Sequence, residues 1–279
     1  MAQRVRRVVF IAGMFPLPVL GLLSAATVIM IAQLRGPREA LQDCALALAL
    51  LATIALLVGM NMPLLVGWAT MSWLVWTGLG TLQGRFGSLQ LTVQVAVIVG
   101  LVALLLTLFL PGDITAFWVA TLEQLYKDFA VEGVKIEADI RAQADVMSGV
   151  VAAGTLAASL LALSLANSWA AALTAGDYGA QFRRFRLGFV IGALAAVAGL
   201  AEWLGVPTHG VLLVFGVAFS FQGMAVLAWW ADVLGWPRGW GVGLCILLIL
   251  IPNLLIIGLA LFCAIGFIDN WYSLRRKTA

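Results

Sequence analysis

Long runs of uncharged, mainly apolar residues, separated by short charged gaps, constrain this chain more than any other feature. Between Arg186 and Asp269 only Glu202, Asp232 and Arg238 carry a charge. A segment of roughly 20 apolar residues is long enough to cross the hydrocarbon core of a bilayer. Because 63% of all residues are hydrophobic and 10% are charged, the chain lacks the polar side chains that a water-facing surface needs. The sequence therefore predicts a multi-pass membrane protein.

We expect an all-α fold, because a helix satisfies its own backbone hydrogen bonds within lipid. The prediction is a polytopic transmembrane bundle of about eight spans, which form a single domain over residues 1–279. Prolines at 16, 18 and 252 fall within the first and last spans, which we therefore expect to be kinked or broken. The apolar runs place the spans at 8–34, 44–60, 63–83, 90–110, 148–171, 187–204, 209–231 and 242–267.

The basic residues predict an orientation, because short cytoplasmic loops are rich in Lys and Arg. Residues 112–147 carry seven acidic and three basic side chains, whereas Arg183, Arg184 and Arg186 follow the fifth span. We therefore place 112–147 outside and the arginine loop in the cytoplasm. Eight full crossings would then leave both basic termini outside, so we expect at least one broken terminal span to enter the membrane and return. A cytoplasmic acidic segment is the alternative.

Residues 112–147 form the one substantial hydrophilic segment of the chain. Its apolar residues recur at intervals of three and four, which gives a helix one apolar face, and Gly133 divides the segment in two. We expect an extracytoplasmic insertion of two amphipathic helices between the fourth and fifth spans. The apolar face could cover a cavity or dock a partner protein, and the simplest interpretation is that it rests on the membrane surface.

Patterns for catalysis and metal binding do not occur in the sequence. HExxH, GxSxG and P-loop motifs are absent. His209 is the single histidine, and Cys44, Cys245 and Cys263 stand apart without CxxC spacing, so no Cys/His metal site is expected. Basic residues gather in short juxtamembrane clusters that do not trace a phosphate backbone. We therefore expect no enzymatic activity, no catalytic residues, no metal, no cofactor and no nucleic-acid partner.

Two amides near mid-depth are the candidate ligand-binding residues. Gln222 lies near the centre of the seventh predicted span, and Asn253 near the centre of the eighth. An unpaired polar group in hydrocarbon is costly, so each amide needs a partner. They either bond to each other or line a small polar cavity. Glu202 and His209 flank a short turn and could relay protons, although an interfacial polar turn explains them more simply.

Three stretches of the sequence carry a family resemblance. They are Leu34–Ala40 after the first span, Trp169–Leu187 after the fifth, and Phe219–Ala225 followed by Gly266–Arg276 in the C-terminal spans. Their order and spacing resemble the YybS-like family of uncharacterised bacterial integral membrane proteins. The most specific parts are the element around Gln222 and the GxxDxWxxxR pattern that begins at Gly266. The turn at 175–179 departs from the Asn-Pro-Gly type expected of the family.

The resemblance implies a small-molecule-binding bundle, because the helical arrangement of that family is similar to the S components of energy-coupling-factor transporters. It implies a bacterial cytoplasmic (inner) membrane location, with membrane lipids and a small molecule as partners. Together with the two mid-depth amides, it leads to the hypothesis that the small molecule binds near Gln222 and Asn253. The alternative function is a non-catalytic scaffold that docks partner proteins through 113–147 or the Arg183–Arg186 loop. Structural or interaction roles are expected for Arg183, Arg184, Arg186, Asp269, Trp271 and Arg275.

Overall fold

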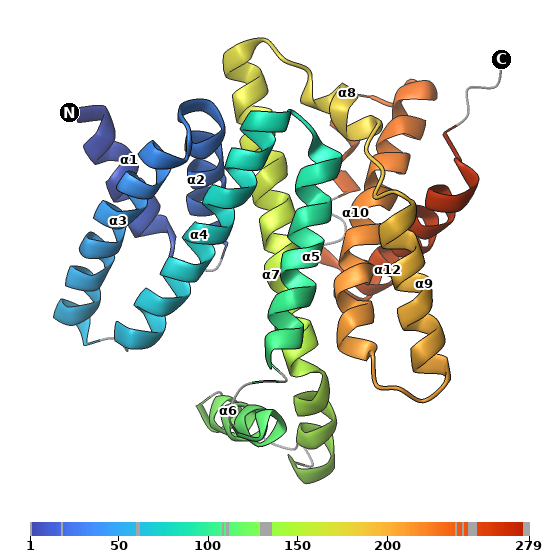
Figure 1. Cartoon of the computed structure of the whole chain (residues 1–279), viewed down its shortest axis with the longest axis horizontal. Coiled ribbons are helices and arrows are strands. Elements are labelled where there is room, and N and C mark those ends of the chain that lie inside the picture. Colours follow the sequence, from blue (N-terminus) through green and yellow to red (C-terminus); the bar gives the residue numbers. More distant parts are fainter. Residues whose placement is uncertain are drawn as a thin grey trace. The chain divides into compact units, whose positions relative to one another are not determined.

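The computed structural model is all-helical in the part of the chain that it describes, which is residues 2–275 apart from 18, 60–61, 108, 110–111, 129–135, 238, 242 and 245–249. Figure 1 shows the helices in chain order. They are α1 (Ala2–Met14), α2 (Gly21–Arg35), α3 (Pro37–Val58), α4 (Met62–Phe86), α5 (Leu89–Thr107), α6 (Ile114–Asp128), α7 (Ile136–Thr174), α8 (Tyr178–Arg183), α9 (Phe189–Trp203), α10 (His209–Val233) and α12 (Pro252–Tyr272).

The chain forms two compact units. Unit 1 comprises Met1–Ala96 and Ala158–Phe185, and unit 2 comprises Val97–Ala157 and Arg186–Ala279. Helix α5 begins in unit 1 and ends in unit 2, whereas α7 begins in unit 2 and ends in unit 1. Because two helices run through both units, this division does not test the expected single domain, which stays a prediction.

Within the described residues, five helices are long and apolar enough to cross a membrane: Pro37–Val58, Leu89–Thr107, Asp139–Thr174, His209–Val233 and Asn253–Tyr272. Two shorter helices, α2 and α9, are also apolar. Large apolar side chains are exposed along these helices, for example Leu56 and Leu57 on α3. Apolar exposure on this scale is unfavourable in water and is expected where lipid surrounds the helices. The architecture is that of a helical membrane protein.

Most of the expected spans coincide with helices. The ranges 44–60, 63–83, 90–110, 187–204 and 209–231 correspond to α3, α4, α5, α9 and α10, with boundaries that differ by a few residues. The boundary expected near Asn61 falls between α3 and α4, and Asn61 itself lies outside the described residues. Gly59 ends α3 in the left-handed conformation, at φ 72°, which glycine adopts without strain.

The first predicted span, 8–34, is two antiparallel helices and not one. Helix α1 ends at Met14 and α2 begins at Gly21, so the proline-containing stretch between them makes a turn. The hydroxyl of Ser24 on α2 donates a hydrogen bond to the carbonyl of Ile11 on α1 at 2.9 Å. This hairpin confirms the expected break. Because the two helices are antiparallel, the end of α2 lies beside the start of α1.

The last predicted span also differs from the expectation of a helix over 242–267. Ile251 has an extended backbone, with φ −123° and ψ 91°, and α12 starts at Pro252 and continues to Tyr272. Proline is well placed at the first turn of a helix because no hydrogen bond is lost there. Residues 245–249, in the first half of that predicted span, lie outside the described residues.

The hydrophilic segment contains α6 and the first turns of α7. Leu122 of α6 packs against Ile140 and Ala144 of α7. Trp118 Nε1 donates a hydrogen bond to Ser148 Oγ at 2.8 Å. The second amphipathic helix is therefore continuous with the fifth predicted span, 148–171, and is not a separate element. The expected break at Gly133 lies outside the described residues.

Candidate functional site

A buried polar cluster in unit 2 unites four residues singled out by the sequence: Arg186, Gln222, Asp269 and Arg275. These four are called the C-terminal network below. Asp269 is fully buried on α12, and its Oδ2 accepts hydrogen bonds from Gln222 Nε2 at 2.9 Å and from Arg275 Nη2 at 2.6 Å. Arg186 Nε lies 3.9 Å from the same oxygen. Charges buried this deeply are stable only while each one has a partner.

The turn after α12 brings Arg275 back to Asp269. Ser273 caps the helix in the left-handed conformation, at φ 50°, which reverses the chain direction. Arg275, six residues beyond Asp269, then donates a further hydrogen bond from Nε to Oδ1 at 3.3 Å. Ser273 Oγ accepts a hydrogen bond from Arg186 Nη1 at 2.8 Å. The acidic and basic residues of the GxxDxWxxxR pattern, Asp269 and Arg275, are therefore bonded to each other.

Gln222 uses both ends of its amide within the protein. Its Nε2 donates to Asp269, and its Oε1 accepts a hydrogen bond from the backbone nitrogen of Leu187 at 2.9 Å. That nitrogen precedes α9, where backbone donors have no acceptor within the helix. Gln222 thereby joins the middle of α10 to the start of α9 and the end of α12.

The structure separates Gln222 from Asn253, the other predicted ligand-binding amide. Asn253 is exposed in the first turn of α12, whereas Gln222 meets residues at the opposite end of that helix. Among the described residues, the hydrogen-bond partners of Gln222 are Leu187 and Asp269. A ligand-binding role for Gln222 and Asn253 stays a prediction.

Glycines allow the backbones of α10 and α12 to touch. A Cβ atom at Gly223 would overlap the carbonyl oxygen of Phe262, and one at Gly266 would overlap that of Phe219. Such close approach through small residues is a common mode of helix packing in membranes. The two most specific elements of the resemblance, around Gln222 and from Gly266 onward, therefore meet in one interhelical contact.

Trp271 and its neighbour Asn270 hold the end of α12 against α9. The Trp271 ring packs edge to face on Phe189, with centroids 5.2 Å apart. Asn270 Oδ1 accepts a hydrogen bond from Gly188 N at 3.0 Å, and Asn270 Nδ2 donates one to Gly188 O at 3.1 Å. The arginines of the preceding loop differ in their surroundings: Arg183 ends α8 and is half-buried, Arg184 is exposed, and Arg186 belongs to the C-terminal network.

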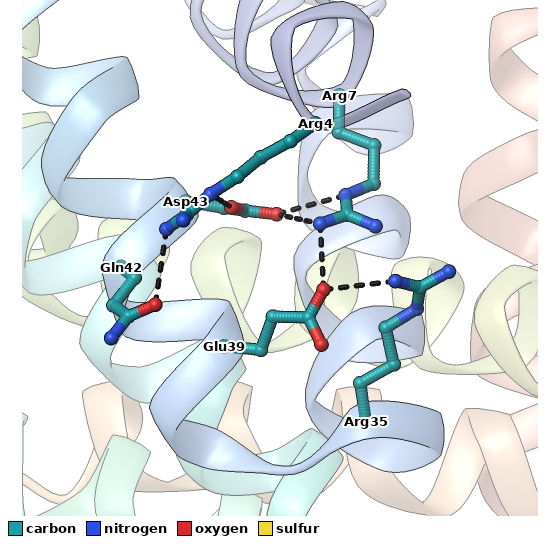
Figure 2. A network of polar contacts seen from close by, with 6 residues as sticks. All are labelled: Arg4, Arg7, Arg35, Glu39, Gln42 and Asp43. Carbon is teal, nitrogen blue, oxygen red and sulfur yellow. Dashed lines mark hydrogen bonds and ion pairs between the residues drawn. The ribbon is translucent and has the colours of Figure 1, made fainter. Parts of the chain in front are cut away.

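A second polar cluster, in unit 1, ties α1 to α3 (Figure 2). Asp43 is fully buried, and it accepts hydrogen bonds from Arg4 Nε at 2.8 Å and Arg7 Nε at 2.9 Å. Arg7 Nη2 also reaches Glu39 Oε1 at 2.7 Å, and Arg35 Nη1 reaches the same oxygen at 2.9 Å. We call these five residues the N-terminal network. It fixes the N-terminus beside the end of α2, as a returning hairpin requires.

A polar hollow lies in unit 1 where the C-terminal parts of α2, α4 and α7 meet α8. Its volume is about 380 Å³. Small residues, among them Gly84 of α4 and Ala170 of α7, form part of its wall. The polar side chains that line it are Gln33, Gln83, Asn167, Thr174, Asp177, Tyr178 and Gln181.

Two amides in this lining have buried atoms without a partner. Gln33 Oε1 and Asn167 Nδ2 form no hydrogen bond within the described structure, and Asn167 is 4% exposed. Leaving a buried donor or acceptor unpaired costs about 1–3 kcal/mol. Native proteins pair the large majority of such groups, with ordered water or a bound molecule where protein partners are missing. The hollow is therefore equipped for a polar occupant.

Helix α8 forms one side of the polar hollow. Asp177 caps it by accepting a hydrogen bond from Ala180 N at 2.9 Å, and Gln181 Nε2 donates to the carbonyl of Gly87 at 2.8 Å. Burial raises the pKa of the Tyr178 hydroxyl to about 12, so the phenol stays neutral. Among the described residues of the lining, Asp177 is the only charged one, and the helix cap already uses it. These surroundings favour an uncharged molecule.

The sequence alone does not single out the residues of this hollow. Gln33 and Asn167 lie toward the ends of their apolar runs, where water can form hydrogen bonds with an amide. Nothing in the sequence therefore indicates that the two side chains meet. The one available signal is that Asn167 lies in the helix that carries small residues at four-residue spacing from Gly154 to Ala170. The described residues contain no group of three or more His, Cys, Asp or Glu side chains placed to hold a metal ion.

Comparison of the chain with protein-family models, with curated proteins and with solved structures gives no match. The resemblance to the YybS-like family therefore depends on the quoted sequence elements alone.

Proposed function

We propose that this chain is a multi-pass protein of a bacterial cytoplasmic membrane that binds a small uncharged polar molecule in the polar hollow of unit 1. The observation that carries the proposal is the pair of unpaired buried atoms, Gln33 Oε1 and Asn167 Nδ2, in the wall of a hollow of about 380 Å³. Sites for small molecules commonly measure roughly 300–1,000 Å³ and use a few convergent polar groups for orientation. The polar hollow has both properties.

The chemistry of the lining restricts the ligand. Asn167 offers an N–H donor and Gln33 a carbonyl acceptor, so the ligand carries both an acceptor and a donor. Amides, nucleosides and polyols fit this description. A strongly charged ligand would have no opposite charge in the lining that is free of a structural hydrogen bond.

The membrane arrangement belongs to the same proposal. Eight membrane-inserted segments, of which the first and the last enter and return, place Arg4, Arg35 and Arg85 on the cytoplasmic side. The last segment returns because Ser273, at the end of α12, bonds to Arg186 of the cytoplasmic arginine loop. The polar hollow then lies toward the cytoplasmic face, because Gln33 and Gly84 adjoin Arg35 and Arg85 in sequence. Membership of the YybS-like family, and binding or transport in the manner of an S component, are supported by the sequence resemblance.

Asn167→Leu tests the proposal by removing the unpaired donor while keeping the branching and the number of side-chain heavy atoms. We expect native mass spectrometry of the wild type to show a bound molecule, and Asn167→Leu to reduce its occupancy about tenfold or more, the loss that follows from one missing buried hydrogen bond. Asn253→Leu is the matched control, because it makes the same change at an exposed amide in unit 2. The control should retain the molecule as the wild type does.

Two outcomes would contradict the polar hollow as the binding site. One is full retention in Asn167→Leu. The other is loss in Asn253→Leu alone, which would favour the site predicted at Gln222 and Asn253. If nothing is retained on purification, thermal stabilisation by a panel of neutral amides, nucleosides and polyols replaces the native spectrum, and the absence of any stabilisation of the wild type counts against ligand binding.

Absence of thermal stabilisation by any ligand of the panel would favour the second candidate function. This function is a non-catalytic scaffold that docks partner proteins through 113–147 or the Arg183–Arg186 loop. The observation in its favour is that α6 packs one face on α7 and exposes Phe117 and Leu125 on its surface. Exposed apolar residues on an amphipathic helix are typical of a docking face or of a helix that rests on the membrane.

A further inference from the structure

A second hollow, in unit 1, is lined mainly by arginines. Its volume is about 370 Å³, and its lining is Arg4, Arg35, Arg38, Glu39 and Gln42. Helices α1, α2 and α3 all contribute to it, near the first turn of α3. Figure 2 shows Arg4, Arg35, Glu39 and Gln42 of this lining, the first three of which belong to the N-terminal network. We call this pocket the arginine hollow.

Positive charge exceeds negative charge around the arginine hollow. Both carboxylates are fully engaged, since Asp43 accepts from Arg4 and Arg7 while Glu39 accepts from Arg7 and Arg35. Arg38 is exposed and has no hydrogen bond or ion pair within the described structure. Four guanidinium groups therefore face two carboxylates, and the excess charge favours an anion. Guanidinium groups bind phosphate through paired N–H donors.

Apolar side chains continue from the arginine hollow along the same helices. Leu41 and Leu46 are exposed within the first turns of α3, the helix that is long enough to cross a membrane. Val5 and Val9 are exposed on α1. An anion-binding pocket with apolar flanks matches a molecule that has an anionic head and hydrocarbon tails. A free phosphate ion would leave the apolar flanks uncovered.

We propose that the arginine hollow binds the phosphate headgroup of an anionic phospholipid, whose acyl chains lie against the exposed apolar residues of α1 and α3. Basic pockets at the membrane boundary attract anionic lipids in this way. Arg38, which forms no ion pair with the described residues, makes the main contact with the phosphate. Arg4 and Arg35 are held in place by Asp43 and Glu39. The site is separate from the polar hollow and does not depend on its function.

Arg38→Gln in the full-length protein tests this proposal. The protein is reconstituted in nanodiscs of equimolar phosphatidylglycerol and phosphatidylcholine, and native mass spectrometry measures the ratio of the two lipids retained. We expect the wild type to retain phosphatidylglycerol in preference, and Arg38→Gln to reduce that preference about fivefold, the effect of one basic residue near a membrane surface. Arg6→Gln is the matched control, since Arg6 is exposed on α1 and does not line the hollow.

The control variant should keep the wild-type preference. Equal reductions in Arg6→Gln and Arg38→Gln would overturn the proposal, because net charge would then explain the effect. Equal retention of both lipids by the wild type would overturn it as well. Inorganic phosphate added in excess separates the two sources of the anion: removal of the preference by phosphate would show a free-anion site and contradict a lipid site. Because Arg38 is exposed, loss of folding is not expected to obscure the result.

Discussion

Asp269→Asn is expected to lower the free energy of unfolding by about 3–5 kcal/mol, the cost of removing one partner from a buried ion pair. The Arg275 side chain is 5% exposed and would lose its counter-charge, while Arg186 would lose its nearest carboxylate. Asparagine can still accept from Gln222, so the loss is chiefly electrostatic. Equilibrium unfolding by sodium dodecyl sulfate in mixed micelles measures the change.

Two further variants identify the cause. Glu123→Gln removes the same charge from an exposed position on α6 and should change the stability by less than about 0.5 kcal/mol. The double variant Asp269→Asn, Arg275→Gln should be more stable than Asp269→Asn alone, because it leaves one buried charge fewer without a partner. Stability of Asp269→Asn close to the wild type, or strictly additive losses in the double variant, would contradict a buried ion pair.

Asp43→Asn is expected to have the second largest effect, a loss of about 3 kcal/mol, at the low end of the range for buried ion pairs. The reason is that Arg4 retains contact with water, with a side chain 43% exposed, and Arg7 keeps its contact with Glu39. Because Asp43 joins α1 to α3, the loss should be local. Hydrogen exchange should become faster in α1 and remain unchanged in α4.

Asp139→Asn is the matched control for this variant, since Asp139 is exposed near the start of α7. It should leave exchange in α1 at the wild-type rate. Uniformly faster exchange in all helices of unit 1 after Asp43→Asn would indicate a general loss of packing. Such a result would be inconsistent with a hairpin that depends on the N-terminal network.

The class of protein and most helices are predictable from the sequence because they depend on local composition. Apolar length alone locates α3, α5 and α10, and the prolines at 16 and 18 indicate the break between α1 and α2. The continuity of α7 was harder to predict, since its first turns are amphipathic and its later turns are apolar. That change of pattern resembles a boundary between two elements.

The polar contacts depend on packing between distant helices, which periodicity does not reveal. The sequence predicts that Gln222 is a buried amide in need of partners, but one partner is the backbone nitrogen of Leu187 and the other is Asp269, at the far end of α12. The sequence marks Asp269 and Arg275 only as parts of a pattern. Their ion pair depends on the turn at Ser273, whose left-handed backbone conformation the sequence does not predict. Asn167 lies near the end of its predicted span, and the sequence does not distinguish such an amide from one that water serves.

Small-molecule binding in unit 1 is tested most directly by an experimental density map of the purified wild-type protein in which ordered waters are visible. We predict compact density for an organic molecule in the polar hollow, within hydrogen-bonding distance of Asn167 Nδ2 and Gln33 Oε1. A hollow that contains only water, or one that closes so that Asn167 and Gln33 bond to protein groups, would contradict the proposal.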